Sequence, residues 1–290
     1  MTIYDALIQP FADYGFMRRA LAACVTMAAS SAPLGVFLVL RRMTLMGDAA
    51  SHAILPGAAI AFLISGVALW PMTIGGLAAG LLMALVAGVI TRITSLKEDA
   101  SFTAAYLTSL AFGVMIISMK GSAVDLLHVL FGNVLAVDKD ALALVNSIAT
   151  LSLFLLAAIY RPLIMECFDP AFLKAQGTRG AIYHQVFLIL VVLNLVAAFQ
   201  VLGTLMAVGI MVLPAIATRF WTKNIDMAIG LSMLFGVFSA TAGLLFSYHF
   251  SLPSGPAIVL TASTWYLISV AIGTSGGILR RYFPRRHIHR

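Results

Sequence analysis

Residues 41–57 read RRMTLMGDAASHAILPG; they follow one long apolar segment and open the next. If the second helix starts near Gly47, Asp48 and His52 are four residues apart, so their side chains share one face. A carboxylate and an imidazole one turn apart form half of a site for a divalent transition metal. Such groups are costly in a membrane span and are usually functional. The alternative is that Asp48 caps the helix at the headgroups and His52 is hydrogen-bonded inside the bundle.

Two prolines indicate interruptions in apolar helices. Pro56 lies four residues after His52 and has no N–H to donate to the His52 carbonyl, which then needs a hydroxyl or water. Pro214 frees the carbonyl of Ile210 in the same way and kinks its helix. Kinked helices often line permeation paths, although a packing kink explains Pro214 equally well. Both prolines are therefore weak candidates for such a path.

The composition is that of a polytopic helical membrane protein. Of 290 residues, 61% are apolar and 10% are charged, and the mean hydropathy is +1.02; a soluble domain carries about 25% charged residues. We expect one all-α membrane domain over residues 1–290, without a separate soluble domain. Each span needs about 20 residues, which predicts nine of them: 18–40, 50–67, 71–91, 101–119, 140–160, 181–199, 202–220, 226–248 and 256–275.

Basic residues indicate the orientation in the membrane. With nine spans, five basic clusters fall on one side, which is then the cytoplasm: residues 41–42, 92–97, 161–179, 219–223 and a basic tail at 279–290. Arg18, Arg19 and Lys120 fall on the other side, with the N-terminus, and are exceptions. These clusters explain the net charge of +7 without nucleic-acid binding.

Two further segments do not have the pattern of a span. Residues 1–16 alternate apolar and polar groups and predict an interfacial arm. Residues 121–139 are too polar and too short for a span, and we expect a re-entrant or interfacial stretch on the outer side. His128 in this stretch is a weak candidate for the path, and a packing histidine is the more common case.

The cytoplasmic segment 166–178 has the pattern of a short helix. Arg161 and Pro162 end the preceding span, after which Asp169 can cap a helix whose first residue is Pro170. Exposed aromatic residues on such a helix favour docking to a protein, whereas an amphipathic loop on the headgroups is the alternative. The candidate docking residues are Phe168, Asp169, Pro170, Phe172, Gln176 and Gly177.

Several catalytic motifs are absent from the sequence. There is no G-x-x-x-x-G-K-[ST], so the chain cannot itself cradle nucleotide phosphates, and no H-E-x-x-H. There is also no G-x-S-x-G and no Cys–His pair that would act as a nucleophile. We expect a protein that moves a solute and is not itself an enzyme.

The chain resembles the membrane permeases of bacterial zinc/manganese ABC importers, the ABC-3 type permease family. The most specific block is LRRMTLMGDAASHAILPG at residues 40–57. Three supporting blocks follow in the family's order: 125–135, 168–177 and 203–215. Together the four blocks extend over nearly the whole chain.

The resemblance implies a type II ABC importer fold in the bacterial cytoplasmic (inner) membrane. Two copies of the permease would surround a central path, each on a cytoplasmic ATPase that uses the ATP, and a periplasmic metal-binding protein would deliver the ion. Residues 168–176 would be the coupling helix. Asp48 and His52 of both copies would contact the transported Zn²⁺ or Mn²⁺, with Fe²⁺ also open, and no cofactor would be permanently bound.

Two other functions are compatible with the residues alone. A metal channel or secondary carrier would use the same ligands and would take up metal without nucleotide. A membrane enzyme or a structural subunit would leave metal uptake unchanged when Asp48 and His52 are replaced by Ala. Membrane lipid is a partner in every case.

Overall fold

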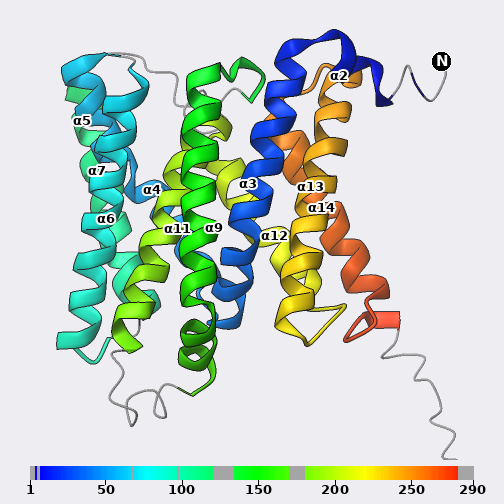
Figure 1. Ribbon diagram of the computed structural model, residues 1–290. Coiled ribbons are helices and arrows are strands. Elements are labelled where there is room, and N and C mark those ends of the chain that lie inside the picture. Colours follow the sequence, from blue (N-terminus) through cyan, green and yellow to red (C-terminus); the bar gives the residue numbers. More distant parts are fainter. Residues whose placement is uncertain are drawn as a thin grey trace, which may run out of the picture.

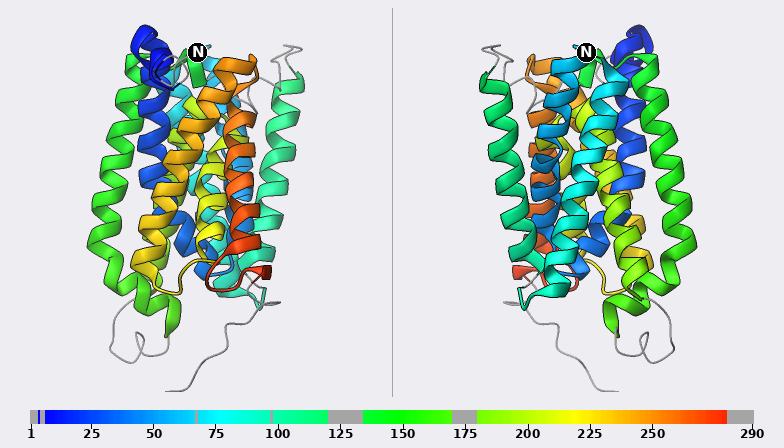
Figure 2. Two further views of the ribbon diagram at one scale, coloured as in Figure 1. Left: turned by 90° about the vertical axis from the view of Figure 1, so that its right-hand side faces the viewer. Right: turned by 90° about the vertical axis from the view of Figure 1, so that its left-hand side faces the viewer.

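The structure, a computed structural model, describes residues 4, 7–66, 68–96, 98–119, 134–169 and 180–279. The described chain contains helices and no strand, and the long helices stand side by side in one bundle (Figures 1 and 2). The helices are α2 (Gln9–Asp13), α3 (Gly15–Leu40), α4 (Thr44–Ala53), α5 (Leu55–Ser65), α6 (Leu69–Ile93), α7 (Glu98–Met119), η1 (Val134–Ala136), α9 (Lys139–Phe168), α11 (Gly180–Leu202), α12 (Thr204–Thr218), α13 (Ile225–Phe250) and α14 (Ser254–Ile272).

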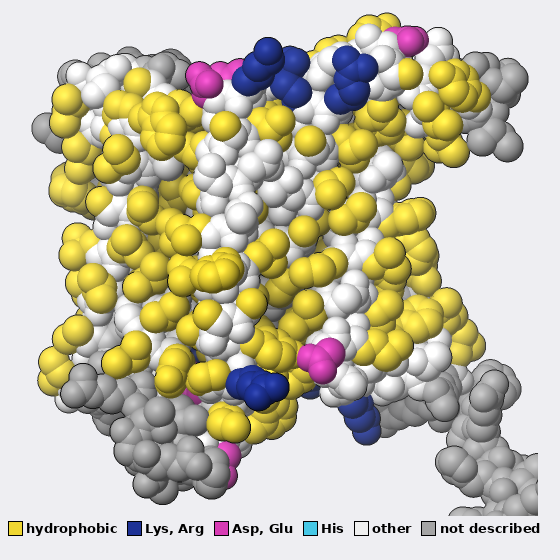
Figure 3. All heavy atoms as spheres, in the orientation of Figure 1, with side chains coloured by type: hydrophobic (Ala, Val, Ile, Leu, Met, Phe, Trp, Pro, Cys, Tyr) yellow, Lys and Arg dark blue, Asp and Glu magenta, His cyan; other side chains and the backbone are white. Residues whose placement is uncertain are grey.

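Each of the nine predicted spans corresponds to a helix, the second to α4 and α5 together. Eight stretches of the described residues are long and apolar enough to cross a membrane. The ninth, α12, has 15 residues and a length of about 22 Å, which is short for a hydrocarbon core of about 30 Å. On the face shown in Figure 3, hydrophobic side chains cover the middle and the charged ones lie near the two ends.

Gly203 is the reason why α12 starts so abruptly. It is the single residue between α11 and α12, and its φ of +80° lies in a region that side chains other than glycine rarely adopt. The chain therefore reverses direction within one residue, and α12 returns through the middle of the bundle. It packs against α3, α11, α13 and α14.

The two ends of the bundle agree with the nine-span count. The C-terminal end of α7 and the N-terminal end of α9 lie at the same end of the bundle, the upper one in Figure 1. Residues 120–133, which include His128, lie outside the described residues. The last part of the predicted outer stretch contains the short helix η1 and Asp138, whose side chain accepts from the Ala141 N–H and caps α9.

Arg18 and Arg19, the two arginines that are exceptions to the predicted distribution of basic residues, both form hydrogen bonds within the protein. Arg19 Nε donates to the Val137 carbonyl at 2.8 Å and so ties α3 to the segment before α9. Arg18 donates to the Ala12 carbonyl at 2.9 Å, at the end of α2. These two charges hold α2 and the N-terminal end of α3, and α3 itself starts at Gly15, before the predicted residue 18.

The prediction that Arg161 and Pro162 end a span was wrong. α9 continues through Pro162 to Phe168 and has 30 residues. Pro162 removes one backbone hydrogen bond, but Leu163 in the next position is fully buried and holds the helix against the core. Two further turns of α9 therefore extend beyond the predicted end.

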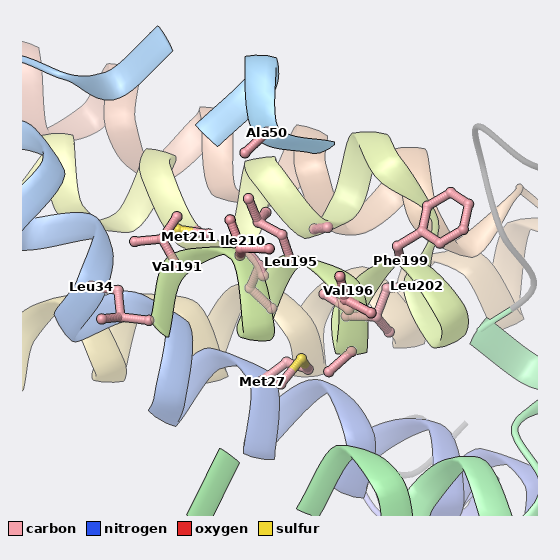
Figure 4. Close-up of a cluster of buried hydrophobic side chains, with 14 of the residues drawn as sticks. Met27, Leu34, Ala50, Val191, Leu195, Val196, Phe199, Leu202, Ile210 and Met211 are labelled. Carbon is pink, nitrogen blue, oxygen red and sulfur yellow. The ribbon is translucent and has the colours of Figure 1, made fainter. Parts of the chain in front are cut away.

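The core is centred on α11. Side chains of α11 such as Val191, Leu195 and Leu202 are buried against α3 and α12 (Figure 4). Ala50 of α4 reaches the same cluster from the other side. Because α4 is thereby attached to the core through its small residues, its polar face is left on the opposite side.

Candidate metal site

The turn between α3 and α4 determines where α4, the helix that carries Asp48 and His52, begins. Arg42 has a φ of +60°, its N–H donates to the Val39 carbonyl at 3.2 Å, and the Met43 N–H donates to the Leu38 carbonyl at 2.9 Å. This pair of bonds is a Schellman motif, which closes the end of a helix. As a result α4 starts at Thr44, one turn before the expected Gly47.

Asp48 and His52 share one face of α4, as their spacing predicts. The distance from His52 Nε2 to Asp48 Oδ1 is 3.6 Å, too long for a direct hydrogen bond. The Asp48 side chain is 57% exposed and that of His52 is 24% exposed. His52 Nδ1 is buried and has no hydrogen-bond partner among the described residues. The two side chains are therefore positioned to contact a common ion.

The helix α7 packs beside His52 and Pro56, and the sequence did not predict these contacts. The Tyr106 ring stacks on the His52 ring, with centroids 6.2 Å apart and an angle of 30°. Gly113 lies against Pro56, because a Cβ built on Gly113 would be only 3.1 Å from the Pro56 nitrogen. No local pattern links these positions to α4, since more than 50 residues separate Tyr106 from His52.

Pro56 interrupts the helix directly after His52. α4 ends at Ala53 and α5 starts at Leu55, and the Ile54 N–H donates to the His52 carbonyl. The His52 carbonyl accepts this backbone N–H, whereas the hydroxyl of Ser109 of α7 donates to the next carbonyl, that of Ala53, at 3.1 Å. A hydrogen bond from another helix therefore reaches the break directly beside the carbonyl that Pro56 frees.

Pro214 lies away from Asp48 and His52. It is buried inside α12, and its ring is 3.8 Å from the position of a Cβ built on Gly236 of α13. By contrast, Val208 and Val212 of α12 lie near Gly47 of α4. A role of Pro214 in the path stays a prediction, as does that of His128.

Asp48 and His52 of one chain could supply only part of a metal shell. In the part of the chain that the structure describes, no group of three or more His, Cys, Asp or Glu side chains is close enough to hold a metal ion. One carboxylate and one imidazole leave a four- or six-coordinate ion with most of its positions open. Such a partial site suits brief contact with a passing ion.

The second predicted site, the docking segment, is described only at its start. Phe168 is the last residue of α9 and is 66% exposed, and Asp169 follows it as the residue that ends the helix. Pro170, Phe172, Gln176 and Gly177 lie outside the described residues. Asp169 is therefore observed at the end of α9, and its capping of a following helix stays a prediction.

Comparisons with known proteins cover almost the whole chain. A sequence profile described as the ABC 3 transport family matches residues 13–273. The chain is 35% identical over 272 residues to the manganese transport system membrane protein MntC of Halalkalibacterium halodurans, covering 93% of this chain and 92% of that one. It is 32% identical over 274 residues to the manganese import system permease protein ScaB of Streptococcus gordonii, covering 94% and 97%.

A solved structure has the same arrangement of helices. A chain of PsaBC from Streptococcus pneumoniae, solved in complex with a Fab, superposes with a TM-score of 0.84 at 31% identity. The match covers 97% of this chain and 100% of that one. The short α12 and the split α4–α5 therefore lie inside a fold that the two chains share over their whole length.

Proposed function

This chain belongs to the ABC 3 transport family and is the permease subunit of a metal importer, and from that premise we propose that its cargo is Mn²⁺, bound in passing by Asp48 and His52. It is a multi-pass protein of the cytoplasmic membrane. The observation that carries the proposal is the pair of ligand atoms 3.6 Å apart on α4, beside a break in the helix.

The choice of manganese rests on two arguments. The relatives at 32% and 35% identity are named for manganese transport. Carboxylate oxygen together with imidazole suits Mn²⁺, although the same set binds Zn²⁺ and Fe²⁺. Because affinity alone favours zinc over manganese at such a site, selection of manganese has to come from coordination geometry, ligand type and metal availability.

A second copy of the chain is proposed to complete the shell. Asp48 is more than half exposed, so its carboxylate is accessible from outside the protomer. A two-fold axis beside α4 would bring two carboxylates and two imidazoles to one ion. Brief binding is an advantage here, because an ion that is held too tightly would stop transport.

ATP hydrolysis is assigned to a separate subunit. We propose that residues 166–178 dock onto a cytoplasmic ATPase, with Phe168 as the exposed aromatic residue at their start. The 30-residue length of α9 supports this, since the helix exceeds the thickness of the hydrocarbon core by several turns. A metal-binding protein on the opposite face would supply the ion, and ATP-driven closure would switch the open side.

The test is uptake of radioactive manganese into proteoliposomes that contain this chain, its ATPase and its binding protein. We expect ATP-dependent uptake that is abolished in Asp48→Asn and His52→Ala and retained in Asp140→Asn. Asp140 is an exposed residue at the start of α9, so its variant controls for the loss of one carboxylate.

Three results would overturn parts of the proposal. Equal uptake by His52→Ala would remove the role of α4 as the metal site. Uptake of zinc or iron in preference to manganese from a mixture would change the cargo. Uptake without the ATPase would identify a channel or carrier in place of an ABC importer subunit.

A further inference from the structure

Arg41, the residue that ends α3, turns its side chain into the protein. Its Nη2 is 3.1 Å from Glu166 Oε1, and its Nη1 contacts His184 Nδ1. The guanidinium carbon lies 5.9 Å from the centroid of the Phe187 ring. The side chains of Arg41 and Glu166 are only 13% and 11% exposed, so this is a shielded ion pair and not a solvated surface charge.

The partners of Arg41 come from both sides of the proposed docking segment. Glu166 is in the last turn of α9, just before residues 168–177. His184 is in the first turns of α11, just after them. Arg41 therefore holds the two helices between which that segment is inserted.

On its other side, Arg41 is connected to the metal ligands by a short and well-ordered link. Only Arg42 and Met43 separate it from α4, and the hydrogen bonds of the Schellman motif hold this turn. Asp48 follows seven residues after Arg41, in the second turn of α4. Because this link is short and hydrogen-bonded, a displacement of the Arg41 backbone also displaces the start of α4.

We propose that Arg41 is a positioning residue of transport, which passes a movement at the end of α9 and the start of α11, the helix ends that flank segment 168–177, to the helix that carries Asp48 and His52. The inference rests on the proposed function, because it takes that segment to be the ATPase contact. Separating Arg41 from Glu166 would leave a buried charge without its partner, which is strongly unfavourable. The end of α9 and the start of α4 therefore move together more readily than they slide apart.

The choice of arginine fits this role. The planar guanidinium presents its donors to two partners in a fixed geometry and also stacks flat on an aromatic ring, whereas a lysine ammonium is a compact point charge on a flexible stem. Arg41 does so with Glu166, His184 and the Phe187 ring. A lysine at this position would keep the positive charge but would lose some of these contacts.

The experiment measures manganese uptake and ATP hydrolysis in the same reconstituted complex, for the wild type, Arg41→Gln, Arg41→Lys and Arg42→Gln. Arg42 is the matched control, because it is the adjacent residue, carries the same charge and is exposed. We expect Arg41→Gln to lower the manganese taken up per ATP about tenfold, within the usual range of coupling between sites. ATP hydrolysis should stay within about twofold of wild type, Arg41→Lys should be intermediate and Arg42→Gln should equal wild type.

Other outcomes overturn the inference. Unchanged uptake per ATP in Arg41→Gln, or a parallel loss of uptake and hydrolysis, would mean that Arg41 only supports the fold. If Arg41→Gln does not assemble with the ATPase, Glu166→Gln decides in the same way, since it keeps the side-chain size and removes the charge. Failure of the proposed function is recognised separately, because the wild-type complex would then show no ATP-dependent manganese uptake.

Discussion

The helices α11 and α7 are both apolar and both long enough to cross a membrane, but they occupy opposite environments. Of the most apolar stretch of α11, 72% is buried, against 17% for α7. α11 is the centre of a scaffold with α3 and α12, whereas α7 stands at the edge beside α4 and α5 (Figure 2). Asp48 and His52, the proposed metal ligands, lie at the border between the two regions, on α4.

The difference in burial between α11 and α7 indicates which part of the protein can move. In a membrane, lipid is as apolar as leucine, so burial of apolar groups does little to hold helices together, and close packing and hydrogen bonds do more. The scaffold has such close packing at Gly35, which lies directly on the α12 backbone. Equally close packing also joins α5 to α6 at Gly57 and Gly75, so the looser part of the edge is α7, which is held by contacts such as those of Tyr106 and Ser109. We expect the scaffold to be rigid and the edge to adjust during transport.

The largest effect is expected for Gly35→Ala in the scaffold. A Cβ at this position would lie 1.9 Å from the Met211 carbonyl oxygen, so α3 and α12 would have to separate. We expect a loss of about 3 kcal/mol in the free energy of unfolding, measured as earlier loss of monodisperse protein on heating in detergent. Gly230→Ala in α13 is the control, because no atom lies within 4 Å of its Cβ position. Equal stability of the two variants would contradict a rigid scaffold.

The next effect concerns transport and not stability. Tyr106→Ala removes the ring that stacks on His52, and an aromatic pair contributes about 1 kcal/mol. We expect the KM for manganese uptake to rise about fivefold, with the heat stability close to that of wild type. Tyr106→Phe keeps the ring and should behave as wild type. An equally large change in Tyr106→Phe would assign the effect to the hydroxyl and refute the stacking argument.

A smaller effect is expected at the break between α4 and α5. Ser109→Ala removes the hydroxyl that donates to the Ala53 carbonyl, which should cost about 1 kcal/mol of stability. Thr108→Ala is the matched control, because the Thr108 hydroxyl bonds only to Ala104 within its own helix. A heat-stability scan of both variants checks the prediction. If Thr108→Ala is the less stable one, the cross-helix bond does not hold the break.

The smallest effect is expected where the two regions join. Arg42 has a φ of +60°, which costs a residue with a side chain about 1 kcal/mol. Arg42→Gly removes this strain from the folded state, but glycine also gives the unfolded chain more backbone entropy, which offsets part of the gain. We therefore expect the free energy of unfolding to rise by about 0.5 kcal/mol. Arg42→Ala removes the same charge and keeps the strain, and it should show no gain. A stabilised Arg42→Ala would assign the effect to charge.

The candidate site shows how far sequence reasoning reaches. Asp48 and His52 were predicted to share a face from their spacing, and the helix places them so, because four residues make about one turn. Tyr106 and Ser109 could not be predicted, since they approach α4 from α7. Arg41 was interpreted as one of the cytoplasmic charges, and only the tertiary structure shows that it forms a mostly buried ion pair with Glu166.

The features of the fold can likewise be separated into those that the sequence predicts and those that only the tertiary structure shows. The sequence by itself determined the membrane class, the number and approximate position of nine apolar segments, and the local pairing of Asp48 with His52 on α4. These properties depend on composition and on helical spacing. Only the tertiary structure decided that α9 continues past Pro162, that α12 returns through the centre, that α11 is buried and that α7 stands at the edge. The physical reason is that apolar side chains suit lipid and protein interior equally well, so a hydrophobic pattern predicts that a helix spans but not what surrounds it.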